Sequence, residues 1–400
     1  MKKRTLSLTI AALTLCLTAG FATACDEDPH EHIWDGGTVT KEATCTEKGE
    51  KTYNCEDCGE IRTEKIDALG HDWGAGVEVS APTYTHDGEA LATCSRCGET
   101  QTVVIEKLSY TADAVVKSGE SIQAAVDSAQ TGDIIEVEAG TYAEQLMLDK
   151  SVTIIGKGEV VIAGPADYAD LVAVEKLATD SKGYIALVAV TDGASVTVEN
   201  VKISADPAKA SAVSQITHYN YFVGVAAIDA SVTLNSVTVK GITFEDHLMG
   251  MQNGIALYAA AEGENRTVTV RYSTFESFNK AAAVIRAGIS MFVFEDNTVT
   301  GMGEQGLIAQ NGIQIHCAAS IARNVIQQLV YAPATANGYE HGSYAMLVYT
   351  ADEGAVTVSD NAVKACDNGV YVNVPGSTEL TGNTYTDMYE GGVNEEVAEA

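Results

Sequence analysis

The chain has 400 residues, of which 46% are hydrophobic and 20% are charged, and its formal net charge is −31. This composition suits two or three globular units with ample core and excludes a disordered chain. The negative charge makes nucleic acid an unfavourable partner, and it opposes tight binding of polyanions such as pectate unless a divalent cation bridges the two.

The first residues have the pattern of a secretion signal. Three basic residues precede an apolar run, and a stretch of small residues then ends in Cys25. This resembles the signal of bacterial lipoproteins, which implies a signal peptide over residues 1–24, lipid attachment at Cys25 and a tether over 25–31. A transmembrane helix is the alternative, but the run is short and acidic residues follow it at once. We therefore expect a lipid anchor on the extracellular face of the bacterial cell membrane.

Residues 32–108 contain an internal duplication, with repeats at 32–70 and 71–108. Five residues of the first repeat recur 39 positions later in the second, and they are His32, Trp34, Cys55, Cys58 and Gly59. A unit this small buries little apolar surface, so a cross-link of some kind is expected to stabilise it.

Each repeat offers four metal ligands. Those of the first are His32, Cys45, Cys55 and Cys58, and those of the second are His71, His86, Cys94 and Cys97. The second repeat has Tyr84 where the first has Cys45, but it gains His86, and this replacement favours structural zinc. Disulfides are the alternative, because extracellular cysteines are often oxidised. The repeats resemble Cys-rich repeats on surface proteins of Gram-positive anaerobes, which implies a stalk or an interaction module. Four ligands leave no open position for catalysis.

The stretch 118–156 predicts a short helix followed only by strands. Ser118 is the expected N-cap of the helix, and Gly132 lies just past its end. The apolar residues with helical spacing are Ile122, Ala125, Val126 and Ala129. Short alternating apolar runs follow, with a turn expected at residues 140–142.

The order of helix, Gly-Asp, strand, Gly-Thr-Tyr, strand and Ile-Ile-Gly resembles the opening of right-handed parallel β-helix proteins of the pectin-lyase-like superfamily. The resemblance covers residues 109–385 and implies an all-β solenoid with an N-terminal helical cap. Two small zinc-ribbon-like repeats precede the solenoid, and an acidic tail follows it over 386–400. It implies no single activity, because that superfamily holds lyases, esterases, hydrolases, epimerases and non-catalytic adhesins.

Beyond residue 156 a strand–turn unit recurs seven times. Its reference positions are spaced 22 to 37 residues apart, and they are Val201, Val237, Ser273, Asn297, Asn324, Asn361 and Asn383. We expect the four Asn residues to form a hydrogen-bonded ladder along the solenoid. Asn-Gly pairs at 253–254, 311–312 and 368–369 are expected to open other strands of the coils. Cys317 and Cys366 are expected to be small apolar residues or turn residues.

The longer spacings predict inserted loops, where function would lie. Candidate catalytic residues are Glu245, Asp246, His247 and Lys280, and candidate substrate-binding residues are His218, Tyr219, Tyr221, Tyr339, Glu340 and His341. The two adjacent carboxylates would point to opposite sides of an extended chain, so a hydrolase would need a second carboxylate from another coil. Arg286 and Arg323 are further candidates for a base or for binding a sugar carboxylate.

Signatures of the common pectin-active enzymes are not found in the sequence. We therefore expect a surface β-helix protein that binds or contacts polysaccharide or cell-wall glycan without necessarily cutting it. One alternative is a polysaccharide lyase, which would use calcium and a Lys or Arg base, or a hydrolase. A second alternative is a structural or adhesive rod with protein partners.

Overall fold

The computed structural model describes residues 31–178, 182–213, 216, 220–244, 253–263, 265–332, 342–349, 355–373, 378–389 and 395–397. The chain forms two compact units. One comprises the residues up to 77 together with 91–103, and the other comprises 78–90 and the chain from 104 onward. Within the described ranges, no helix has the length and apolar character needed to cross a bilayer.

Each repeat forms a small three-stranded sheet. The first contains β1 (Thr38–Lys41), β2 (Gly49–Asn54) and β3 (Ile61–Ile66), which pair as antiparallel neighbours in that order. The second contains β4 (Val77–Ser80), β5 (Gly88–Thr93) and β6 (Thr100–Ile105), in the order β4-β5-β6. All four residues of β1 are exposed, and so are five of the six residues of β3. Hydrophobic burial therefore contributes little to the fold of the first repeat.

Helix α1 (Ile122–Ser128) lies at the start of the solenoid and buries Ile122 and Val126. Its N-cap is Ser121, whose Oγ accepts a hydrogen bond from Ala124 N at 3.1 Å, so the expected cap at Ser118 is wrong. The residues between them form a turn, in which Glu120 N donates to the carbonyl of Lys117. The first amide groups of the helix also donate to the Glu144 carboxylate, which is 22 residues away from Ile122 in the chain.

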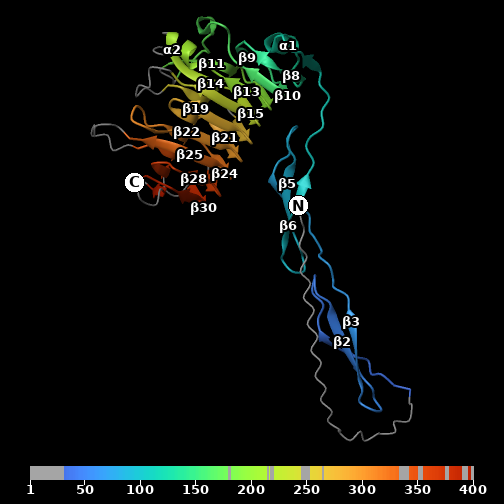
Figure 1. Cartoon of the computed structure of the whole chain (residues 1–400). Helices are drawn as coiled ribbons and strands as arrows, with labels where there is room; N and C mark the ends of the chain where they lie inside the picture. The colour runs from blue at the N-terminus through green and yellow to red at the C-terminus, as the bar shows by residue number, and fades with distance from the viewer. Residues whose placement is uncertain are drawn as a thin grey trace, which may run out of the picture. The chain divides into compact units, whose positions relative to one another are not determined.

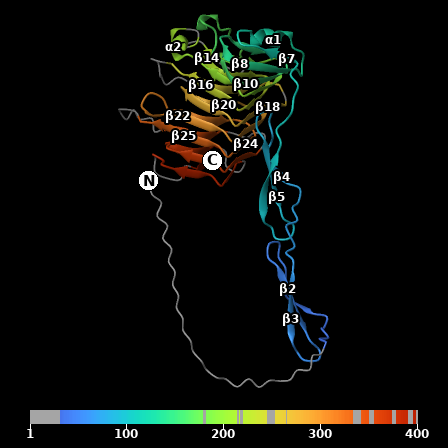
Figure 2. The same ribbon diagram turned by 45° about the vertical axis from the view of Figure 1, so that its right-hand side comes forward.

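The solenoid has three faces, each a parallel sheet, and neighbouring coils pair strand to strand (Figures 1 and 2). The first face contains β7 (Ala114–Val116), β8 (Ile134–Tyr142), β10 (Thr153–Ile162), β12 (Ser195–Glu199), β15 (Ser231–Asn235), β18 (Arg266–Arg271), β21 (Ile289–Glu295), β24 (Ala319–Ala322), β27 (Val356–Ser359) and β30 (Thr378–Thr381). The second face joins the later halves of β8 and β10 to β13 (Lys202–Ser204), β16 (Thr238–Ile242), β19 (Thr274–Phe278), β22 (Thr298–Gln305), β25 (Val325–Tyr331), β28 (Ala362–Lys364) and β31 (Thr384–Thr386). The third face contains β9 (Leu146–Leu148), β11 (Gly183–Val190), β14 (Asn220–Ile228), β17 (Ile255–Ala260), β20 (Ala281–Ile285), β23 (Asn311–Ile315), β26 (Tyr344–Val348), β29 (Asn368–Val372) and β32 (Glu395–Val397).

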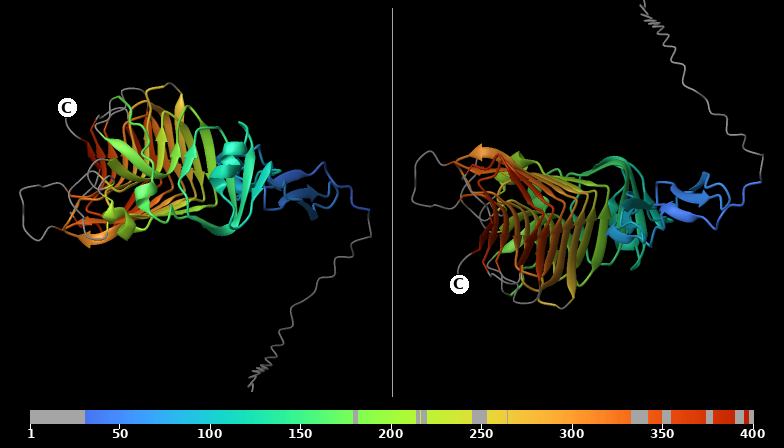
Figure 3. Two further views of the ribbon diagram at one scale, coloured as in Figure 1. Left: turned by 90° about the horizontal axis from the view of Figure 1, so that it is seen from above. Right: turned by 90° about the horizontal axis from the view of Figure 1, so that it is seen from below.

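The fold is a right-handed parallel β-helix, with the hand that parallel crossover connections take. Figure 3 shows the strands of successive coils side by side along the solenoid. Short helical segments interrupt the coils, among them the 3₁₀ turn η1 (Tyr168–Asp170) and α2 (Pro207–Ala212). The turn expected at residues 140–142 lies inside β8, which runs on to Tyr142 and pairs there with β10.

The interior holds one continuous apolar core, because alternate residues of all three faces point inward. Cys317 and Cys366 are buried in it, as the sequence predicted. The predicted strand starts are also confirmed, since β17 follows the first Asn-Gly pair and β23 and β29 begin at the other two.

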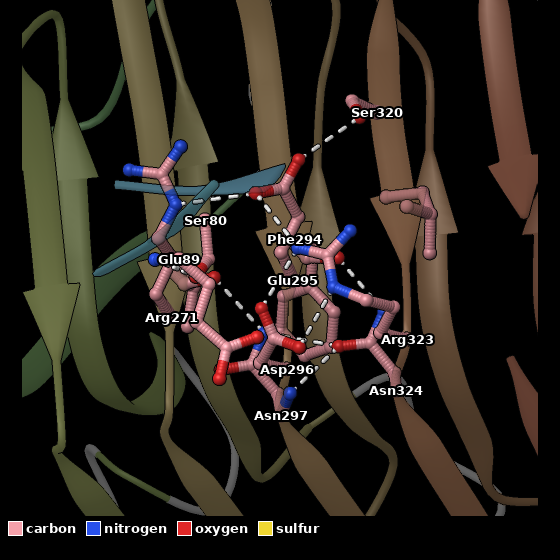
Figure 4. Close-up of polar contacts among 12 residues, drawn as sticks. Ser80, Glu89, Arg271, Phe294, Glu295, Asp296, Asn297, Ser320, Arg323 and Asn324 are labelled. Carbon is pink, nitrogen blue, oxygen red and sulfur yellow. Dashed lines mark hydrogen bonds and ion pairs between the residues drawn. The ribbon is translucent and has the colours of Figure 1, made fainter. Parts of the chain in front are cut away.

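The Asn ladder is confirmed at the corner between the first and second faces (Figure 4). Asn324 Oδ1 accepts from the backbone N and the Nδ2 of Asn297 at 2.9 and 3.1 Å. Asn361 Oδ1 accepts in the same way from Asn324, at 2.9 and 2.8 Å, and Asn383 from Asn361, at 3.0 and 2.9 Å. The first three of these side chains are at most 1% exposed, so the ladder satisfies polar groups that water does not reach.

Each ladder residue follows a residue in the left-handed region. Asp296, Arg323 and Asp360 have φ between 56° and 59°, and Gly382 has φ of 68°. A Cβ on Gly382 would lie 2.2 Å from Asp360 Oδ1, so a larger residue there would have to displace the Asp360 side chain.

Candidate functional site

Two groups of potential metal ligands form within the described part of the repeats. In each group the ligand atoms all lie within 4.8 Å of one another. The groups are His32, Cys55 and Cys58, and Cys45, His71, Cys94 and Cys97. Thiolates and imidazoles are the donors that zinc takes in structural sites, so these groups can hold a metal such as zinc.

The surroundings of the histidine are alike in the two groups. His32 Nδ1 lies 3.5 Å from Cys58 Sγ, and its Nε2 lies 3.1 Å from the Glu60 carboxylate. In the second repeat, His71 Nδ1 lies 3.4 Å from Cys97 Sγ, and its Nε2 also lies 3.4 Å from the Glu99 carboxylate. A carboxylate on the far nitrogen fixes the tautomer and leaves the near nitrogen available as a metal ligand. The arrangement therefore fits a metal bound through Nδ1.

Cys45 lies in a different group from the one expected. Its Sγ is 3.8 Å from Cys94 Sγ, which places it with the ligands of the second repeat. The cause is local. The first repeat ends with Leu69 and Gly70, which we call the linker, and the amide of Gly70 donates to the Cys45 carbonyl at 3.0 Å. The expectation of a self-contained set of four ligands in each repeat is therefore wrong.

His86, expected as a ligand of the second repeat, contacts the solenoid instead. Its ring stacks on Tyr272 with centroids 4.8 Å apart, and its Nδ1 lies 2.9 Å from Ser236 Oγ. Next to it, the backbone N and Oγ1 of Thr85 donate to the buried carboxylate of Glu199 at 2.5 and 2.7 Å. The His86 loop is thus docked on a solenoid corner.

Lys280 immediately precedes β20, and its ammonium donates to the carbonyl of Ala309 at 2.7 Å. Burial lowers the pKa of Lys280 to about 8, because desolvation disfavours the charged form. A lysine in this state can act as a base near neutral pH.

Other candidates on the solenoid have packing or ion-pair roles. Tyr221 packs against the ring pair of Tyr184 and Tyr258, at centroid distances of 5.9 and 6.2 Å. Arg323 pairs with Asp296 at 2.8 Å, and this hydrogen bond raises the pKa of the guanidinium (Figure 4). Arg286, by contrast, is exposed where the chain leaves β20.

A cluster of half-buried aromatic rings lies on the outer side of the third face, on β26 and β29 and directly after the ends of β23 and β26. We call His316, Tyr344, Tyr349 and Tyr371 the tyrosine platform. His316 stacks on Tyr349 with centroids 5.0 Å apart and planes inclined by 13°. Tyr371 lies 6.1 Å from Tyr349 and 5.8 Å from Tyr344. The rings hold one another in place, so they present a preorganised surface.

Polar groups accompany these rings. In the strand register, Gln314 pairs with Leu347 of the next coil, and Leu347 pairs with Tyr371 of the coil after that. The Gln314 amide and the Tyr371 ring therefore point to the same outer side of the third face. The Gln314 amide nitrogen lies 2.9 Å from His316 Nε2. Burial and the nearby Arg286 charge lower the pKa of His316 to about 4, so the imidazole is neutral above that pH and accepts this hydrogen bond.

Most of the loop candidates lie outside the described residues. They are His218, Tyr219, Glu245, Asp246, His247, Tyr339, Glu340 and His341, and the expected lipidation site Cys25 also lies outside them. Sequence reasoning missed the platform, although a signal was present. In the strands opened by Asn311 and Asn368, alternation alone places Gln314, His316 and Tyr371 on the outer side.

No family model matches this sequence, and no curated protein matches it. Among solved structures, the chain is similar to a GH136 lacto-N-biosidase from Eubacterium ramulus, with 15% identity and a TM-score of 0.46 over 68% of this chain. The chain spans about half of that enzyme, 55% of its length.

Two further similar structures are matched over most of their length. A pectin methylesterase from Aspergillus niger has 14% identity and a TM-score of 0.40, over 74% of this chain and 93% of that one. A family 28 exopolygalacturonase from Yersinia enterocolitica has 11% identity and a TM-score of 0.38, over 91% and 97%. All three are named for enzymes of carbohydrate chemistry, but likeness at this level assigns no activity and no residue role to this chain.

Proposed function

We propose that this protein is a surface β-helix that binds polysaccharide on the outer side of its third face, through the tyrosine platform. The observation that carries the proposal is the mutual packing of four aromatic rings beside an amide and an exposed guanidinium. Flat, rigid rings match the apolar faces of sugar rings, and the Gln314 amide and Arg286 offer donors to hydroxyl or carboxylate oxygens.

Binding without cleavage accounts for the described groups of the platform, which are phenols, an imidazole, an amide and a guanidinium. Hydrolysis of a glycosidic bond requires a pair of carboxylates at a fixed separation. The carboxylates suggested by the sequence for that role are Glu245, Asp246 and Glu340, and they stay predictions. Lys280 favours a second candidate, a polysaccharide lyase, because its lowered pKa suits removal of a proton next to a carboxylate.

The platform is tested by titrating the purified full-length protein with plant, host and bacterial polysaccharides. Replacing Tyr349 or Tyr371 by alanine should weaken binding of the preferred glycan about tenfold, equivalent to about 1.4 kcal/mol. Binding should be constant between pH 5 and 8, because His316 stays neutral above a pKa of about 4. The matched control is Tyr53→Ala, since Tyr53 is a half-buried tyrosine in the first repeat.

Equal loss of affinity in the control and platform variants, or no effect in any of them, would remove the platform from the proposal. The same mixtures are followed for unsaturated and reducing products, with calcium and with chelator. Product formation that Lys280→Met abolishes would replace the binding role by the lyase.

We also propose that Cys25 carries a lipid that anchors the protein on the extracellular face of the bacterial cell membrane, as its place after the apolar run suggests. The full-length chain expressed in a bacterium should then partition into the detergent phase of a Triton X-114 extract. Cys25→Ser should move it to the aqueous phase. Equal partitioning of the two chains would contradict the anchor.

The ligand groups in the repeats, we propose further, hold zinc in a structural role. Support comes from the S/N donor sets and from the carboxylates behind both histidines. The first repeat, whose strands bury so little apolar surface, needs such a cross-link.

A further inference from the structure

We infer that one zinc ion is shared by the two repeats. Cys45 of the first repeat completes a four-ligand site whose other members belong to the second, and they are His71, Cys94 and Cys97. We call this the junction site. The inference rests on the proposal that the repeats hold zinc, and it adds that the metal bridges them.

The donor spacing matches tetrahedral zinc. With Zn–S bonds of about 2.3 Å, two thiolates of a tetrahedral site lie about 3.8 Å apart, and a thiolate and an imidazole nitrogen lie about 3.5 Å apart. Cys45 and Cys94 Sγ are 3.8 Å apart, and Cys97 Sγ lies 3.4 Å from His71 Nδ1. Cys45 and Cys94 are also buried, at 8% and 1% exposure, so the sulfurs face one another within the unit.

The backbone brings Cys45 to this place. The linker amides of Leu69 and Gly70 donate to the carbonyls of Thr44 and Cys45, at 2.9 and 3.0 Å. On the other side, the Arg96 guanidinium donates to the linker carbonyls of Leu69 and Gly70, at 2.9 and 3.0 Å. The linker is therefore held between the Cys45 turn and the Cys-x-x-Cys turn that carries Arg96.

The end of the second repeat supplies an independent comparison. Adding 39 to Cys45 and His71 gives Tyr84 and Tyr110, and the backbone bond from Leu69 to Thr44 recurs there from Leu108 to Thr83, at 2.8 Å. Tyr84 and Tyr110 pack edge to face with centroids 5.4 Å apart.

At the junction between the two repeats, the two positions thus hold a Cys–His ligand pair. At the junction between the second repeat and the solenoid, the two equivalent positions hold a pair of tyrosines. The change of both residues together indicates that Cys45 and His71 act as one pair across the junction. It also explains why the second repeat has no cysteine at position 84, since no third repeat follows to receive it.

The test is cysteine alkylation of the zinc-loaded full-length protein under native conditions, read by peptide mass spectrometry together with zinc content. Cys45→Ser should remove one equivalent of zinc and accelerate alkylation of Cys94 and Cys97 at least tenfold. Cys55 and Cys58 should react as in the unsubstituted protein. Self-contained repeats predict the reverse, with Cys55 and Cys58 exposed and Cys94 and Cys97 protected.

Two further variants keep the outcome decisive even where Cys45→Ser disturbs folding. Cys55→Ser should leave Cys45 protected, whereas self-contained repeats would expose it. His86→Ala, the matched control, should leave Cys94 and Cys97 protected, because His86 docks on the solenoid. Exposure of Cys45 by the first variant, or of Cys94 by the second, overturns the junction site. Absence of zinc with the cysteines oxidised in pairs in the unsubstituted protein overturns the zinc proposal itself.

Discussion

Replacing Asn324 by alanine should lower the free energy of unfolding of the solenoid by about 3–5 kcal/mol. The side chain accepts two hydrogen bonds from Asn297 and donates to the Phe294 carbonyl and to Asn361 Oδ1, both at 2.8 Å. Asn324 is only 1% exposed, so water cannot replace these hydrogen-bond partners. Each buried polar group left unsatisfied costs about 1–3 kcal/mol. Urea unfolding followed by far-UV circular dichroism measures the loss.

Asn383→Ala is the matched control. Asn383 belongs to the same ladder and makes the same kinds of bond, but it is half-exposed at the last described rung. Water can satisfy its partners there, so the expected loss is about 1 kcal/mol. Equal losses at Asn324 and Asn383 would show that the ladder does not depend on burial.

Removing the metal should unfold the repeats and leave the solenoid intact. Structural zinc contributes about 10–16 kcal/mol in zinc-finger peptides at neutral pH, which exceeds what the sparsely buried strands of the first repeat supply. The solenoid has its own continuous apolar core and needs no metal to fold.

The chain contains two tryptophans, and both are in the repeats. Trp34 and Trp73 stack on His32 and His71, with centroids 5.2 and 4.6 Å apart. Chelation should therefore change the tryptophan emission, while the far-UV β signal persists and zinc, but not magnesium, restores the emission. Unchanged emission in protein shown to be free of metal would contradict the structural role.

Much of the solenoid could be predicted from sequence because its rules are local and repeated. Alternation gave the strands, and the recurrence of Asn at one position gave the ladder. The cap of α1 could be predicted less well, since the Glu144 carboxylate that satisfies its first amides comes from a later strand connection. Spacing alone also cannot decide between a set of metal ligands inside one repeat and a set shared by two repeats, because His86 offered a fourth ligand within the second repeat.

The platform shows a different limit. Its rings come from three consecutive coils, and only the strand register places Leu347 between Gln314 on one neighbouring strand and Tyr371 on the other. Alternation places Gln314, His316 and Tyr371 on the outer side of their strands, but it does not predict which of these side chains become neighbours in adjacent coils. The sequence analysis placed the candidate site in the loops because histidines and carboxylates are concentrated there. The rings of the tyrosine platform lie instead on strands or directly after them.

The Asn ladder also bears on how such a chain can change over time. Reference positions are 22 to 37 residues apart along the chain, yet the bonds between the four Asn rungs all fall between 2.8 and 3.1 Å. Insertions elsewhere in a coil therefore leave the Asn ladder unchanged, because each Asn hydrogen-bonds only to the Asn of the coil before it and of the coil after it. A gene duplication that adds one whole coil would supply a new rung whose partners already exist. Loops can diversify, and coils can be gained or lost, without redesign of the interior.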